Sequence, residues 1–97
     1  MKYRFPNIRH MRVFLETADC GSVSVAAQRC NLSQPAATQA IKQLETQFNT
    51  SLLTRRRKRI TLSVCGTLFS VRARVAMHHL NEGAEAALRV AGNKTRS

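Results

Sequence analysis

The sequence predicts a small, mainly α-helical domain that contains a helix-turn-helix, a short β-hairpin and a long final helix. Apolar residues recur at helical spacing in three stretches between residues 8 and 48. Five consecutive basic residues, 55–59, then precede the segment ITL, whose apolar, polar, apolar order is typical of a short strand. Helical spacing returns after Gly66 and continues to about Ala91, a length of roughly 40 Å from Val64 at 1.5 Å per residue.

Composition limits the classes of function. A chain of 97 residues is one domain with a modest core, too short for an enzyme with a substrate domain of its own. Sixteen Lys and Arg against five Asp and Glu give a formal charge of +11. This excess favours a polyanionic partner, either nucleic acid or an anionic membrane surface.

The sequence argues against the membrane alternative. No run of about eighteen apolar residues is present, and the amino terminus lacks the apolar stretch of a signal peptide. A membrane-surface protein would place its basic residues along one amphipathic helix, whereas five of the sixteen cluster at 55–59. We therefore expect a cytoplasmic protein with no membrane partner.

Cap residues mark the first two helices. Asn7 precedes a stretch in which apolar residues recur at helical spacing, and Gly21 ends it. Ser22 can cap a second helix of about two turns, VSVAAQRC, with one face of small residues. The members of the two apolar faces are Ile8, Met11, Phe14, Leu15 and Ala18 in the first helix, and Val23, Ala26, Ala27 and Cys30 in the second.

The third helix follows the three-residue turn NLS, so the second and third helices form a helix-turn-helix. Ser33 is its expected cap, and Pro35 lies in the first turn, where a missing N–H costs little. Its core face consists of Ala37, Ile41, Leu44 and Phe48, and its outer face of Gln34, Thr38, Gln39 and Lys42.

The outer face carries side chains that can read DNA. Gln can pair with adenine N6 and N7, Thr and Pro can contact a thymine methyl, and Lys can donate to guanine or phosphate. Ser22 stands at a helix amino terminus, where free N–H groups favour an anion. A merely solvated face is the alternative. The expected contacts in this region are Ser22, Ser33, Gln34, Pro35, Thr38, Gln39 and Lys42.

The basic run is expected to form a hairpin beside the third helix and to contact phosphate or the minor groove. Its members are Arg55, Arg56, Arg57, Lys58 and Arg59. A patch that only increases solubility is the alternative.

The long helix is apolar on more than one side, which predicts two partners. One face carries Leu68, Val71 and Val75, and a second carries Ala73, Ala76, Leu80, Ala84 and Ala87. One partner is the chain's own core, and a second copy of the same helix is the other. A helix that bends back on its own body is the alternative. The expected dimer interface comprises Leu68, Val71, Val75, Ala76, Leu80, Ala84 and Ala87.

No set of residues predicts catalysis, a metal or a cofactor. Cys20, Cys30 and Cys65 are widely spaced and odd in number, which fits reduced, mostly buried packing residues. His78 and His79 point about 100° apart on a helix and cannot share a metal. The five carboxylates fall in no catalytic motif, so we do not expect an enzyme.

Over residues 7–91 the chain carries a set of motifs in a fixed order: MRVFLETADCGSVSVAAQRCNLSQPAATQAIKQLE, then LLTR, the basic run, ITLSVCG and a long helix. In these motifs and their order the chain resembles the LysR-type transcriptional regulators. The resemblance implies a winged helix-turn-helix that binds promoter palindromes as a homodimer, and a larger effector-binding domain that is absent here. The resemblance thus divides the chain into a DNA-binding domain (1–62), a linker and dimerisation helix (63–91) and a disordered tail (92–97).

The chain departs from the family pattern mainly in the hairpin. Arg57 stands where the hairpin turn often carries Gly, and Ser63 and Cys65 replace the usual Thr and Ala before Gly66. Cys30 and Leu53 replace a common Leu and Phe but remain apolar. The resemblance therefore implies sequence-specific binding of double-stranded DNA. It also implies that any small-molecule effector acts through the absent domain. A sequence-independent nucleic-acid protein of nucleoid or ribosomal type is the alternative, because charge alone suffices for it.

Overall fold

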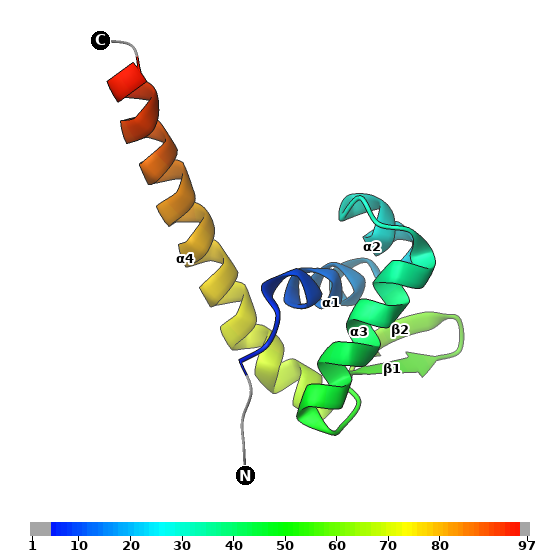
Figure 1. The fold of residues 1–97 in the computed structure, drawn as a ribbon. Coiled ribbons are helices and arrows are strands. Elements are labelled where there is room, and N and C mark those ends of the chain that lie inside the picture. The colour runs from blue at the N-terminus through cyan, green and yellow to red at the C-terminus, as the bar shows by residue number, and fades with distance from the viewer. Residues whose placement is uncertain (1–4, 96–97) are drawn as a thin grey trace.

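A computed structural model describes residues 5–95 of the chain, with side chains through Gly92. In this range four helices and one hairpin follow the predicted order, so the predicted fold class is confirmed (Figure 1). The elements are α1 (Ile8–Cys20), α2 (Val23–Arg29), α3 (Gln34–Phe48), β1 (Leu53–Arg56), β2 (Arg59–Leu62) and α4 (Val64–Thr95).

The first three helices begin at the predicted caps. The Asn7 side chain accepts hydrogen bonds from the backbone N–H groups at the start of α1, at 2.8 and 3.3 Å. Ser22 and Ser33 do the same for α2 and α3, each at 3.2 Å. Gly21 ends α1 with φ of 73°, a left-handed conformation that favours glycine. Local chemistry therefore sets these boundaries.

The core lies where α1, α2 and α3 meet. Phe14, Leu44 and Leu52 are fully buried and form one cluster. A second cluster uses small residues, including Ala27 of α2 and Ala37 of α3, which allow these two helices to approach closely. The small-residue face that the sequence predicts for α2 is thus part of the core.

α4 joins the core through its first turns. The Phe69 ring lies 4.7 Å from the Phe48 ring and 5.7 Å from the Phe14 ring, measured between centroids. At Gly66 a Cβ atom would stand 1.9 Å from the Leu52 carbonyl oxygen, so only glycine allows the start of α4 to pass this close. Beyond Met77 the described side chains of α4 are exposed, and the helix projects away from the body (Figure 1).

Several sequence expectations need correction. Ala73 is 2% exposed and packs on the body, so it does not belong to a partner-facing stripe. Ile8 and Cys65 are exposed although both were expected inside, because helical spacing alone does not say where a stripe ends. Cys20 and Cys30 are half-buried. α4 continues to Thr95, so residues 92–95 are helical, and residues 96–97 of the expected tail lie outside the described residues.

Candidate nucleic-acid interface

The exposed face of α3 displays the predicted polar residues. Ala37, Ile41 and Leu44 are buried, and this places the intervening side chains on the opposite side of the helix. The predicted contact residues of this face are all exposed: Gln34, Pro35, Thr38, Gln39 and Lys42. The first two turns of α3 therefore offer amide and hydroxyl groups to a partner, and Lys42 adds an ammonium group one turn further along.

The hairpin presents the basic run beside α3. β1 and β2 are antiparallel, and Arg55 faces Ile60 across the ladder. Ile60 is buried and anchors the hairpin, whereas all five basic residues of 55–59 are exposed. Arg57 has φ of 55°, in the left-handed region where the turn would favour glycine. The turn thus places an arginine at the tip despite its backbone cost.

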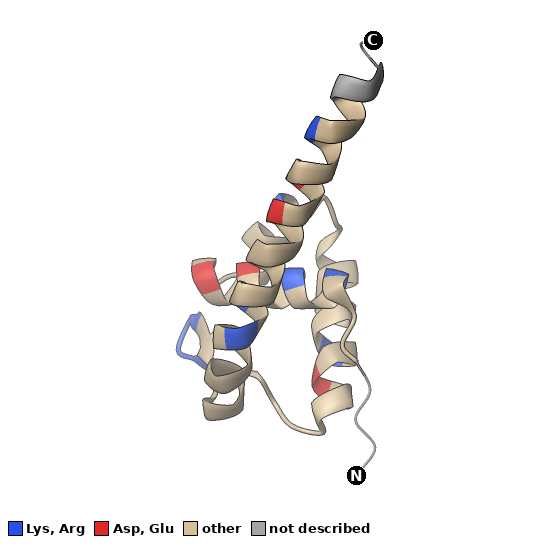
Figure 2. Cartoon of the chain, turned by 90° about the vertical axis from the view of Figure 1, so that its left-hand side faces the viewer, with Lys and Arg blue, Asp and Glu red and all other residues tan. Residues whose placement is uncertain are grey.

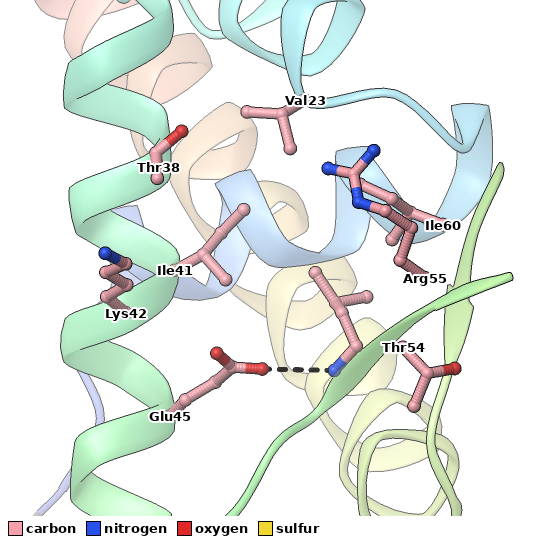
Figure 3. Close-up of a pocket in the computed structure, with 9 residues that line it drawn as sticks. Val23, Thr38, Ile41, Lys42, Glu45, Thr54, Arg55 and Ile60 are labelled. Atoms are coloured by element: carbon pink, nitrogen blue, oxygen red, sulfur yellow. Dashed lines mark hydrogen bonds between the residues drawn. The ribbon is translucent and has the colours of Figure 1, made fainter. Parts of the chain in front are cut away.

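Two contacts fix the hairpin relative to the helices. The Glu45 carboxylate of α3 accepts hydrogen bonds from the backbone N–H groups of Leu52 and Leu53, at 2.8 and 3.2 Å. The bond to Leu53 is the dashed line in Figure 3. On the other side, the Ile60 N–H donates to the Gly21 carbonyl at 3.3 Å. Sequence reasoning treated Glu45 as part of the family pattern and missed its role in holding the hairpin.

A groove separates α3 from the hairpin. Its floor is apolar, with Ile41 and Ile60, while Thr38, Lys42 and Arg55 extend from its walls (Figure 3). The groove has a volume of about 210 Å³ and is open to solvent. The polar face of α3 and the basic hairpin thus form two ridges of one surface.

A second, smaller cavity brings three segments of the sequence together. Ser22 and Ser24 of the α2 start, Gln34 of α3, and Arg55 and Lys58 of the hairpin line a space of about 140 Å³. Four of these residues were predicted as contacts, and Ser24 was not. The Ser24 hydroxyl donates a hydrogen bond to the Gln34 side-chain oxygen at 2.9 Å. A periodicity argument could not find this bond, because it joins residues of two different helices.

The acidic residues leave the basic hairpin without ion pairs within the described part of the chain. Glu16 pairs with Arg29 of α2 at 3.4 Å, and Asp19 pairs with Arg74 of α4. Glu82 lies 3.5 Å from His78 and 3.7 Å from His79 on α4. The charge of the hairpin is therefore unneutralised, and Figure 2 shows Lys and Arg gathered over its loop.

The apolar residues predicted for a dimer interface remain exposed on α4. Leu68 is 70% exposed and Leu80 is 52% exposed, large fractions for leucine. Leu88 and Val90 are exposed too, and the sequence interpretation had not included them. The full predicted set, Leu68, Val71, Val75, Ala76, Leu80, Ala84 and Ala87, lies on the solvent-exposed part of α4.

Three helices with a tight second turn, followed by a basic hairpin against the third helix, define a winged helix-turn-helix protein. The family described as "Bacterial regulatory helix-turn-helix protein, lysR family" matches residues 8–67. The chain therefore belongs to this family. Hereafter residues 53–62 are called the wing.

Known proteins agree with this assignment. The chain is 34% identical over 84 residues to the HTH-type transcriptional regulator AlsR of Bacillus subtilis, covering 87% of the chain and 28% of AlsR. It is similar to Vibrio fischeri DarR, solved in complex with DNA, with 27% identity, a TM-score of 0.80, and coverage of 91% of this chain and 30% of that one. The CbnR_DBD-DNA complex gives 27% identity, a TM-score of 0.75, and coverage of 88% and 98%.

The chain thus spans 28% of the length of AlsR, a curated relative that is named as a transcriptional regulator. In the part of the chain that the structure describes, no helix is long and apolar enough to cross a membrane.

Proposed function

We propose that this chain binds double-stranded DNA sequence-specifically, as the DNA-binding part of a LysR-type transcriptional regulator. The observation that supports this most is the pairing of an exposed Gln, Thr and Lys face on α3 with an unneutralised basic wing beside it. DarR and CbnR_DBD, which share the fold, were solved with DNA. A regulator of bacterial promoters works beside the chromosome, so we place the protein in the cytoplasm.

The first two turns of α3 enter the major groove in this proposal. Gln34, Thr38 and Gln39 then face base edges, and Pro35 offers apolar contact to a thymine methyl. Lys42 stands one turn further along the helix and meets a phosphate. The buried side of α3 fixes the direction of these side chains, so their geometry is set before DNA arrives.

The wing and the helix caps contact the DNA backbone. The exposed side chains of 55–59 carry five positive charges toward phosphates or the minor groove. The Ser22 and Ser33 oxygens accept backbone hydrogen bonds, and each hydroxyl proton stays available to donate to a phosphate. The groove between α3 and the wing separates these backbone contacts from the base contacts of α3.

Two copies joined through α4 read two half-sites. The exposed leucines and valines of α4 would remain in water in a monomer, and burying Leu80 alone contributes roughly 1.5 to 3 kcal/mol per copy. Two reading helices on one face of the duplex stand about 34 Å apart. A homodimer therefore favours interrupted palindromes over single half-sites.

Selection of bound sequences from random duplexes tests the function. We expect enrichment of a palindromic motif, and we expect bulk DNA to compete poorly with the selected duplex at a fixed salt concentration. Equal competition by both DNAs would replace the proposal with sequence-independent binding of nucleoid type, for which charge suffices.

A further inference from the structure

Ser24 and Gln34 link the two helices of the helix-turn-helix through their side chains. Ser24 is the second residue of α2, and Gln34 is the first residue of α3. The Ser24 Oγ donates to the Gln34 Oε1 at 2.9 Å, although both side chains are exposed and other orientations are open to them. A hydroxyl can donate to an amide oxygen or accept from an amide NH2 group, and here it donates to the oxygen.

The backbone on both sides of this bond is well supported. The Ser33 cap fixes the start of α3, and the Leu32 N–H donates to the Ala27 carbonyl at 2.8 Å across the turn. Ala27 and Ala37 are buried between the two helices. The distance between Ser24 and Gln34 is thus set by packing, and the bond needs no movement of the backbone.

The charges nearby favour the same orientation. Arg55 and Lys58 line the cavity that Ser24 and Gln34 share, so the electrostatic potential there is positive. A positive potential attracts the carbonyl end of an amide and repels its amino end. The carbonyl of Gln34 therefore lies toward Ser24, and its NH2 group is left for a partner.

We propose that Ser24 is a specificity-determining positioning residue that makes Gln34 a hydrogen-bond donor toward the base it meets. This inference rests on the proposed function. A glutamine that pairs with adenine at two points must offer its carbonyl to N6 and its NH2 to N7. With the carbonyl directed to Ser24, Gln34 prefers the two acceptors of guanine, O6 and N7. The residue type alone suggests that Gln34 pairs with adenine, whereas its orientation in the structure favours guanine.

Base preference in Ser24→Ala, Ser24→Thr, Gln34→Ala and the Ser24→Ala/Gln34→Ala double variant tests the inference. Each protein is assayed against duplexes that carry each base pair in turn at the position affected by Gln34→Ala. We expect Ser24→Ala to shift the preference from guanine toward adenine by about 2- to 10-fold, the effect of one hydrogen bond. Ser24→Thr keeps the hydroxyl and is expected to keep the wild-type preference.

The double variant separates positioning from direct contact. If Ser24 acts through Gln34, removing its hydroxyl has no further effect on base preference once Gln34 is alanine. Three outcomes overturn the inference: an unchanged preference in Ser24→Ala, an equal loss on all duplexes, or a full Ser24→Ala effect in the Gln34→Ala background. A wild-type protein without any base preference would instead overturn the proposed function itself.

Discussion

Arg74 of α4 makes two hydrogen bonds to the Asp19 carboxylate at the end of α1, at 2.5 and 3.1 Å. The two residues are 55 positions apart in the sequence, and their elements otherwise meet through apolar contacts around Phe14 and Phe69. The hydrogen bonds from Arg74 hold the pKa of Asp19 below its ordinary value of 3.8, against a smaller opposing effect of burial. The pair therefore helps to set the direction in which α4 leaves the body.

Asp19→Asn is expected to reduce the free energy of unfolding at neutral pH by about 0.2 to 1 kcal/mol, because both side chains are nearly half exposed. The folded-state pKa is lowered, so the contribution is complete above pH 3.8 and is lost as the pH falls through the folded value. Urea unfolding of both proteins checks this. The difference between them should vanish well below pH 3.8, and a difference that persists there would mean that the ion pair is not its source.

Gln39→Ala is expected to lose roughly 1 to 3 kcal/mol of discrimination at one base pair and to leave non-specific binding unchanged, because an exposed amide on α3 reads a base edge. Binding to single-base variants of the selected duplex measures this loss. Gln43→Ala is the matched control, since Gln43 is an exposed amide on the side of α3 that faces His10. Equal effects of the two changes would mean that the exposed face of α3 does not read base edges.

Replacing Arg55, Arg57 and Arg59 together by Ala is expected to weaken binding to all duplexes alike. Each lost phosphate contact should make the slope of log K against log salt shallower by about 0.9. Arg89→Ala, on the projecting part of α4, serves as a charge control. If the wing variant and the wild type have the same slope, the wing makes no phosphate contacts and is only a solvated surface.

Glu45→Ala is expected to destabilise the wing, because two backbone N–H groups lose a charged acceptor. Hydrogen bonds to charged groups contribute about 1.5 to 3 kcal/mol, and Glu45 is half-buried. Hydrogen exchange at Leu52 and Leu53 should accelerate in the variant. Glu85→Ala, an exposed carboxylate of α4, should leave that exchange unchanged.

Leu80→Asp is expected to convert a dimer at micromolar concentration into a folded monomer that protects a single weak half-site. The change places a charge in an apolar contact, which is costly to bury. Sedimentation equilibrium compares the two proteins, and Asn81→Asp adds the same charge about 100° around the helix. Normal dimerisation of Leu80→Asp would exclude this face of α4 from the interface.

The elements that the sequence predicts correctly are those decided by neighbours in the chain. Asn7, Ser22 and Ser33 cap helices because each cap acts within three residues. Helical periodicity likewise placed the polar face of α3 on the outside. Helix caps and helical periodicity depend on residues close in sequence, so they predict structure correctly without knowledge of the tertiary packing.

The contacts that orient the site were not predictable in the same way. Ser24 meets Gln34, and Asp19 meets Arg74, only because helices pack at particular angles. Ala73 shows the same limit, since it belongs to a small-residue stripe of α4 but faces the body. A pattern says which residues share a helix face, and packing decides which partner that face meets.

The projection of α4 beyond the body makes it a lever arm. From Phe69 to Thr95 the helix spans about 39 Å at 1.5 Å per residue, so a tilt of about 5° near Phe69 moves the far end by about 3.4 Å. One base-pair step along DNA is about 3.4 Å. In a dimer joined through α4, a small change of tilt near Phe69 would thus displace the second copy along the DNA by about one base pair. The stiffness of that joint, as much as any contact to a base, would then limit which half-site separations such a dimer accepts.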